Sequence, residues 1–103
     1  MPIIQVTVIS GSIEDGEFVG KQINDVVGRK LSEITTEKPK TAKLLCHGKE
    51  LVRIRVFAGK EVLSEEAVTA LGKKVVKAVR GKKKIILCVF PHKRCFITGV
   101  GEL

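Results

Sequence analysis

Hydrophobic and polar residues alternate in two stretches of the chain, 3–9 and 51–57, and this alternation predicts two β-strands. Successive side chains of a strand point to opposite faces of a sheet, so each stretch has one apolar face. Those faces consist of Ile4, Val6 and Val8 in the first stretch and of Val52, Ile54 and Val56 in the second. Arg53 and Arg55 fall on the other face of the second strand. A third stretch, 84–90, is almost wholly apolar, which is typical of a strand buried on both faces.

Two further segments repeat their hydrophobic residues at helical spacing. The first predicts a helix over residues 13–34, with Ser12 as N-cap and Asp15 completing a near capping box. The second predicts a helix that follows the N-cap Ser64 and ends near Gly81, a residue type that favours helix C-termini. The apolar stripes are Phe18, Ile23, Val26, Val27, Leu31 and Ile34 in the first helix and Val68, Leu71, Val75 and Val79 in the second.

Two short segments complete the predicted order of elements. Residues 42–47 are expected to form a short second strand, and residues 95–98 a short strand at the edge of the sheet. The order is then β-α-β followed by β-α-β. Right-handed crossovers put both helices on one face of the sheet. Gln5, Thr7 and the two arginines then lie on the opposite face, where they suit a subunit interface or a central channel.

The two halves of the chain, about residues 1–49 and 50–103, match in register. Val6 and Ile54 are 48 positions apart, and such an offset between similar segments indicates an internal duplication. A chain of 103 residues has room for one domain. We therefore expect a single α/β domain over residues 1–103, with two βαβ units forming a four-stranded mixed sheet and two helices on one face. A ferredoxin-like sandwich is the alternative with the same order of elements.

The positive charge of the chain is concentrated in its second half. The net charge is +8; residues 1–50 carry seven basic and seven acidic side chains, whereas residues 51–103 carry twelve basic and four acidic ones. This asymmetry suggests an anionic partner, which is nucleic acid, a membrane surface or a small acidic molecule; the alternative is a solvated basic face that keeps the protein soluble. Stacking on nucleic-acid bases finds little support, because Tyr and Trp are absent and the four Phe mostly fit a core or loops.

Cysteine usage and apolar runs indicate the compartment. Three cysteines, an odd number, do not make a disulfide framework and favour a reducing environment. No apolar run reaches the roughly 20 residues that span a bilayer, and the N-terminal residues lack the pattern of a secretory signal. We expect a cytoplasmic protein without membrane contact.

The cysteines and histidines do not have the spacing of zinc knuckles, which argues against a metal site. A cysteine nucleophile would need a third group to orient its base, and the sequence indicates none. No metal or cofactor is therefore expected. The residues considered for these sites are Cys46, His47, Cys88, His92 and Cys95.

Both ends of the chain resemble one known family. The N-terminal sequence Met-Pro-Ile-Ile-Gln-Val-Thr-Val, residues 1–8, resembles the beginning of 4-oxalocrotonate tautomerase and its relatives, in which proline follows the initiator methionine. The C-terminal residues 96–103 are similar to the segment of that family in which a phenylalanine and glycines close the active site. Two βαβ units in 103 residues look like the macrophage migration inhibitory factor branch and like small bacterial proteins of the same fold. The resemblance to the tautomerase superfamily covers the whole chain in its order of strands and helices.

This resemblance implies an enzyme that interconverts the keto and enol forms of a small anionic carbonyl compound, with Pro2 as the base. Removal of Met1 turns the Pro2 nitrogen from a tertiary amide into a secondary amine. A free α-amine has a pKa of about 8, and apolar surroundings and nearby cations lower that pKa. Such an amine accepts protons near neutral pH.

The resemblance also assigns the other site positions and the assembly. Lys60, Lys84 and Arg94 are expected to hold the anion, and Phe96 to form an apolar wall. Lysine stands at positions where the family has arginine, and it lacks the fork that binds a carboxylate through two bonds. The resemblance implies a symmetric trimer, and exposed strand edges and a polar sheet face favour assembly over a monomer. The alternative function is a non-catalytic protein whose basic second half binds nucleic acid or another polyanion.

Overall fold

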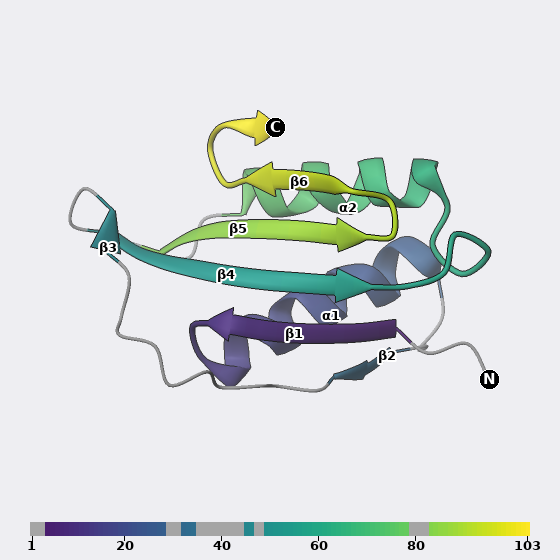
Figure 1. Ribbon diagram of the computed structural model, residues 1–103, viewed down its shortest axis with the longest axis horizontal. Helices are drawn as coiled ribbons and strands as arrows, with labels where there is room; N and C mark the ends of the chain where they lie inside the picture. Colours follow the sequence, from purple (N-terminus) through teal and green to yellow (C-terminus); the bar gives the residue numbers. More distant parts are fainter. Residues whose placement is uncertain (1–3, 29–31, 35–44, 47–48, 79–82) are drawn as a thin grey trace.

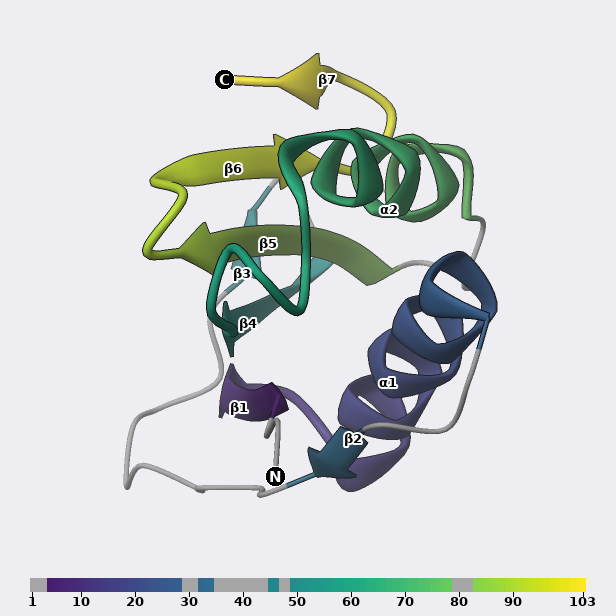
Figure 2. The same cartoon turned by 90° about the vertical axis from the view of Figure 1, so that its right-hand side faces the viewer.

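The computed structural model describes residues 4–28, 32–34, 45–46, 49–78 and 83–103. In this part of the chain, seven strands form one mixed sheet, and two helices cover one of its faces (Figures 1 and 2). The elements are β1 (Ile4–Ser10), α1 (Ile13–Val27), β2 (Ser32–Ile34), β3 (Leu45–Cys46), β4 (Lys49–Phe57), α2 (Glu65–Lys77), β5 (Lys83–Phe90), β6 (Arg94–Ile97) and β7 (Gly101–Glu102). The predicted α/β class with both helices on one face is therefore confirmed.

The strands follow the order β2-β1-β4-β5-β6-β7, and β3 pairs with β4. The two strands of each βαβ unit lie side by side and parallel, β1 with β2 and β4 with β5. The units meet where β1 and β4 pair antiparallel. This pairing differs from the split βαβ units of a ferredoxin-like sandwich, in which another strand separates the two strands of a unit. The predicted number of four strands is wrong, because the described residues form seven: the edge strand β6 adds to the four predicted for the two βαβ units, and β2 and β7 were not predicted.

The first helix ends earlier than the hydrophobic spacing predicts. It stops at Val27 because Gly28 adopts a left-handed conformation, with φ 78°, and donates its backbone N–H to the Asn24 carbonyl at 2.8 Å. Residues 32–34, predicted to be helical, form β2 beside β1 instead. A strand needs only three residues to pair with an existing edge, and this length is too short to show a periodicity.

The short segment at 42–47 also pairs differently from the expectation. Only Leu45–Cys46 is a strand in the described residues, and it pairs antiparallel with β4 rather than completing the first βαβ unit. The rest of the predicted strand lies outside the described residues. The strand predicted at residues 95–98 is confirmed within one residue, because β6 covers Arg94–Ile97.

The predicted helix beginnings are confirmed. The Ser12 hydroxyl accepts the backbone N–H of Asp15, and the Asp15 carboxylate accepts the backbone N–H of Ser12, which is a reciprocal capping box. The Ser64 hydroxyl accepts the backbone N–H of Ala67 at 3.2 Å. The second helix ends at Lys77, and the predicted end near Gly81 lies outside the described residues.

The hydrophobic core lies between the sheet and the two helices. Alternate residues of β1, β4 and β5 point into it and are fully or almost fully buried, as are Ile23 of the first predicted stripe and Val68, Leu71 and Val75 of the second. Phe18, Val26 and Val27 are only partly buried, and Leu31 and Val79 lie outside the described residues. Its sheet side consists of Ile4, Val6, Val8, Val52, Ile54, Val56, Ile85, Leu87 and Val89, and its helix side includes Val19, Ile23, Val68, Leu71 and Val75. The intervening residues Ile86 and Cys88 of β5 are only half-buried, so the prediction that this strand is buried on both faces is wrong for the single chain.

Candidate functional site

The face of the sheet opposite the helices, here called the open face, presents the side chains that alternate with the core residues. The pairing register arranges them in rows across the strands. One row runs from Gln5 through Phe57 to Phe90, because Phe57 is the Cα partner of both of the others. The next row runs from Thr7 through Arg55 to the cysteines described below. Aromatic and basic side chains therefore lie next to each other on this face.

The aromatic row borders an open hollow of about 500 Å³ at the end of β4 and β5, here called the end hollow. Its lining residues are Arg55, Phe57, Phe90, Pro91 and Lys93. Phe57 and Phe90 are the last residues of two parallel strands, so both end at the same edge of the sheet. Phe57 is 54% exposed, which is unusual for a large apolar side chain. The end hollow thus combines an apolar surface with two cations.

Neither cation of the end hollow has an acidic partner among the described residues, unlike Lys60 and Arg94. In the described part of the chain, no carboxylate lies within ion-pair distance of Arg55 or Lys93. The Arg55 guanidinium carbon lies 5.7 Å from the centre of the Phe90 ring, a cation–π distance that holds the side chain over the aromatic surface. An anion that enters the end hollow can therefore bind both cations without displacing a carboxylate.

The hollow continues along the open face as a smaller cavity of about 120 Å³. Arg55 and Phe90 line both cavities, and Arg53 adds a third cation. The smaller cavity is otherwise lined by Ile9, Ile54, Ile86 and Cys88. Together the two cavities form an apolar band with arginines along it, which suits a molecule that has both an apolar part and a negative charge.

The predicted base, Pro2, lies outside the described residues. The strand that follows it begins at the end hollow, because Gln5 is the Cα partner of Phe57. Lys60 lies in the exposed loop after β4, with its Nζ 3.9 Å from Glu65. Lys84 lies at the end of the sheet that is farther from the end hollow. Its Cα partner is Leu51, and the strand from Leu51 to Phe57 spans roughly 20 Å. The structure does not bring Lys84 together with Lys60.

The guanidinium of Arg94 is already engaged by protein groups. It donates to both carboxylate oxygens of Glu102, at 2.6 and 2.7 Å, and to the Glu65 carbonyl at 3.0 Å. The hydrogen bond to Glu102 is the main reason why the pKa of Arg94 is raised above its ordinary value. Arg94 and Lys60 thus both contact Glu65, at some distance from the aromatic row of the open face.

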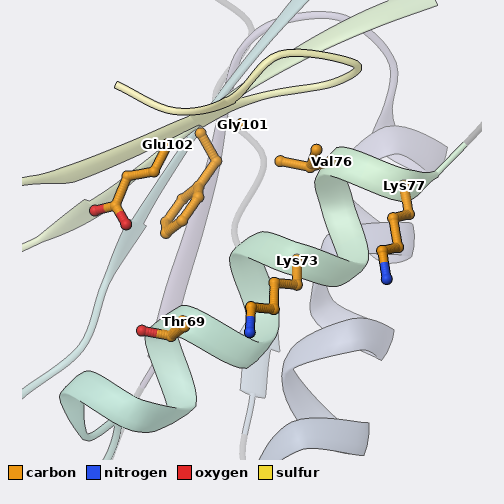
Figure 3. Close-up of a pocket in the computed structure, with 7 residues that line it drawn as sticks. Thr69, Lys73, Val76, Lys77, Gly101 and Glu102 are labelled. Atoms are coloured by element: carbon orange, nitrogen blue, oxygen red, sulfur yellow. The ribbon is translucent and has the colours of Figure 1, made fainter.

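Phe96 lies on the helix side of the sheet and is only 3% exposed. Its ring packs against Gly72 of α2 and lines a cavity of about 220 Å³ between α2 and β7 (Figure 3). The other lining residues are Thr69, Lys73, Val76, Lys77, Gly101 and Glu102. The sheet separates this cavity from the end hollow, so the predicted anion-holding and apolar positions are not gathered in one place. Their roles in binding stay predictions.

Sequence reasoning placed Arg55 on the open face but missed Phe57, Phe90 and Lys93 as neighbours of it. A signal was present in the order of elements. Phe57 and Phe90 each end a strand of the second βαβ unit, and the parallel strands of such a unit end at one edge of the sheet. Lys93 follows in the turn after β5 with a left-handed backbone, φ 56°, that the sequence does not indicate.

The described histidine and cysteine side chains do not form a metal site. Among residues with described side chains, no three His, Cys, Asp or Glu groups converge in a way that could hold a metal ion. The His92 ring is buried, with Nε2 2.6 Å from the Leu63 carbonyl, and so it anchors the loop before α2. Neither helix of the described chain is long and apolar enough to cross a membrane.

Comparison with known proteins adds no further assignment. No family model matches the chain, and no curated protein matches it significantly.

Proposed function

We propose that the protein binds a small anionic carbonyl compound in the end hollow and, once Met1 is removed, catalyses keto–enol proton transfer with Pro2 as the base. The observation that carries the proposal is the pair of cations Arg55 and Lys93 beside two aromatic rings, with no described carboxylate to neutralise them. Two adjacent parallel βαβ units that meet at β1 and β4 also agree with the resemblance to the tautomerase superfamily.

The start of β1 supports a role for Pro2 at this site. Pro2 precedes Ile4 by two residues, and a polypeptide covers at most about 3.6 Å per residue. Covalent geometry therefore limits the separation of these two Cα atoms to about 7 Å. Ile4 is followed by Gln5, whose Cα partner Phe57 lines the end hollow. We therefore propose that a free prolyl amine reaches a molecule bound there.

The proposed chemistry needs no cofactor. The neutral prolyl nitrogen takes a proton from the carbon next to the carbonyl group, and the electrons of the broken C–H bond form an enolate. The same nitrogen returns its proton to oxygen or to a different carbon, so the reaction is a net isomerisation. Arg55 binds a carboxylate of the substrate through its fork of donors. Lys93 stabilises the negative charge that develops on the enolate oxygen.

We further propose that three copies of the chain associate, as the resemblance implies. The open face supports this, because the exposed ring of Phe57 and the half-buried side chains of Ile86 and Ile97 leave apolar surface uncovered in one chain. A partner subunit on this face would also close the open hollow and exclude water from the reaction.

The test measures ketonisation of phenylpyruvate enol by protein whose lack of Met1 is verified by intact mass. Arg55→Ala is expected to lower kcat/KM roughly 10- to 100-fold, since a hydrogen bond to a charged group contributes about 1.5–3 kcal/mol. Pro2→Ala is expected to abolish the activity. Lys74→Ala removes an exposed cation from α2, on the other side of the sheet, and is the matched control. An unchanged rate in Pro2→Ala, or equal rates in the Arg55 and Lys74 variants, would contradict the proposal.

Binding of a polyanion is the second candidate, and the distribution of the lysines argues against it. Arg53 and Arg55 lie on the open face, whereas Lys73, Lys74 and Lys77 belong to α2 on the opposite side. A nucleic-acid strand needs cations along one continuous surface to follow its phosphates. Steeply salt-dependent binding of a labelled oligonucleotide would favour this candidate, and little or no binding at low salt would remove it.

A further inference from the structure

Two cysteines lie directly opposite each other on neighbouring antiparallel strands of the open face. Cys88 of β5 and Cys95 of β6 are Cα partners, and both are free thiols. Both side chains are half-buried, and Cys88 lines the smaller cavity of the open face. Arg55 is the Cα partner of Cys88 on its other side, so the two thiols continue the row that begins with Thr7 and Arg55.

The backbone hydrogen bonds show which kind of antiparallel pair this is. Thr98 donates its N–H to the Ile85 carbonyl at 3.0 Å, so these two residues form a hydrogen-bonded pair. Hydrogen-bonded and non-hydrogen-bonded pairs alternate along an antiparallel ladder. Cys88 and Cys95 lie three pairs further along and are therefore a non-hydrogen-bonded pair. The Cys95 carbonyl supports this assignment, because it accepts the N–H of Leu103 on the side of β6 that faces away from β5.

This kind of pair has the geometry that a disulfide needs. Opposite Cα atoms of a non-hydrogen-bonded pair lie about 4.5 Å apart, with their side chains close together. Disulfides join residues whose Cα atoms are about 4.4–6.8 Å apart. The two sulfurs can therefore bond without a rearrangement of the strands. The loop closed by such a bond is short, so in the chain-entropy model the bond stabilises the fold somewhat less than a disulfide that closes a longer loop.

The two thiols are not equivalent. Burial, a hydrogen bond with Cys95 and the charge of Cys95 raise the pKa of Cys88 to about 11, and the nearby Arg53 and Arg55 offset only part of this effect. Cys88 therefore keeps its proton at neutral pH. Because the thiolate is the attacking species in thiol–disulfide exchange, the raised pKa disfavours Cys88 as the first nucleophile.

We propose that Cys88 and Cys95 are a redox-active dithiol that exchanges with small-molecule disulfides and forms a cross-strand disulfide. The Cys95 thiolate attacks one sulfur of the small disulfide, the S–S bond breaks, and the first small thiolate leaves and takes up a proton. The Cys88 sulfur, on losing its proton, then attacks the Cys95 sulfur and expels the second small thiolate. One small disulfide is reduced to two thiols, and the protein dithiol is oxidised by the same two electrons.

The experiment equilibrates the full chain, with Cys46→Ser to remove the third thiol, in buffers of reduced and oxidised glutathione. Free thiols are then blocked with a maleimide, and the protein is digested with trypsin. Cleavage after Lys93 and Arg94 separates the two cysteines into different peptides, so a disulfide between them links residues 85–93 to 95–103. The linked peptides are expected to increase with oxidised glutathione and to disappear on addition of dithiothreitol.

Single variants test the order of attack. Cys88→Ser is expected to accumulate a mixed disulfide of Cys95 with glutathione, because this variant has no second thiol to displace the bound glutathione. Cys95→Ser is expected to react at least tenfold more slowly. Cys88→Ala replaces the serine variant if circular dichroism shows that the latter does not fold. Two unreacted thiols across all glutathione ratios, or bonds only between different chains, would overturn the proposal. Faster reaction of Cys95→Ser than of Cys88→Ser would overturn the assigned order.

Discussion

Gly72 is a residue whose missing side chain decides how closely α2 approaches the sheet. A Cβ atom at this position would overlap the ring of Phe96, which is packed into the core. Alanine favours a helix over glycine by about 1 kcal/mol, but overpacking of a core costs about 1–3 kcal/mol and opposes that gain. The close contact is between two well-packed elements, so we expect the steric cost to be the larger effect.

The prediction at this scale is that Gly72→Ala lowers the free energy of unfolding by about 1–2 kcal/mol, as measured by urea denaturation. Phe96→Leu in the same protein should recover part of the loss, because the smaller side chain leaves room for the methyl group. Lys74→Ala, at an exposed position of the same helix, is the control and should change stability by less than about 0.5 kcal/mol. A stability gain from Gly72→Ala would mean that the helix approaches the sheet less closely than described.

At the scale of elements, a buried carboxylate links the start of α1 to the start of β5. Asp15 is fully buried, and its carboxylate accepts the backbone N–H and the hydroxyl of Ser12, both at 2.9 Å. The ammonium of Lys83 lies 3.2 Å from the same carboxylate. This contact joins the helix of the first βαβ unit to a strand of the second, across 68 residues of sequence.

The contacts of Asp15 predict a pH dependence of stability. Burial raises the pKa of Asp15, but the hydrogen bonds from Ser12 and the charge of Lys83 together lower it below its ordinary value. A carboxyl whose pKa is lower in the folded state stabilises the fold above its unfolded pKa, near 3.9, and loses this effect as the pH falls through the folded pKa. Asp15→Asn should therefore cost about 1–3 kcal/mol at pH 7, and less at about pH 3.

Chemical denaturation of both proteins across this pH range measures the difference. Most of the loss is assigned to the bonds with Ser12, because Lys83 is partly exposed and water screens its charge. Glu66→Gln changes an exposed carboxylate in the first turn of α2 and is the matched control, with an expected change below about 0.5 kcal/mol. A difference between wild type and Asp15→Asn that does not shrink in acid would contradict the assigned role.

At the scale of the whole molecule, the uncovered open face predicts association. Light scattering should give a mass of three times 11.3 kDa for the proposed trimer. Ile86→Glu places a charge among the apolar residues of the open face and should shift the protein toward the monomer. Val100→Glu, at a 63% exposed position in the turn between β6 and β7, should leave the mass unchanged. A wild-type protein that is monomeric at high concentration would refute the trimer.

Much of the fold could be predicted because it depends on local patterns. The alternation around Ile54 and the caps at Ser12 and Ser64 predicted their elements correctly, since each depends on neighbours a few residues away. The strand β2 and the pairing of β3 could not be predicted this way: residues 32–34 were predicted to be helical, and the strand predicted at 42–47 pairs with β4 instead of completing the first βαβ unit. β2 has three residues and β3 has two, and strands this short exist only because an edge of another strand is available to pair with them.

The sequence by itself determined the three long strands, the beginnings of both helices and the basic character of the second half. Only the tertiary structure decided which strands are neighbours and which side chains meet. The site shows the reason: Phe57 and Phe90 are 33 positions apart, yet they end parallel strands at one edge and share a hollow with Arg55 and Lys93. Cys88 and Cys95 face each other because the turn between β5 and β6 sets their register. Such contacts depend on strand pairing, which arises from the packing of the whole chain and has no local periodicity.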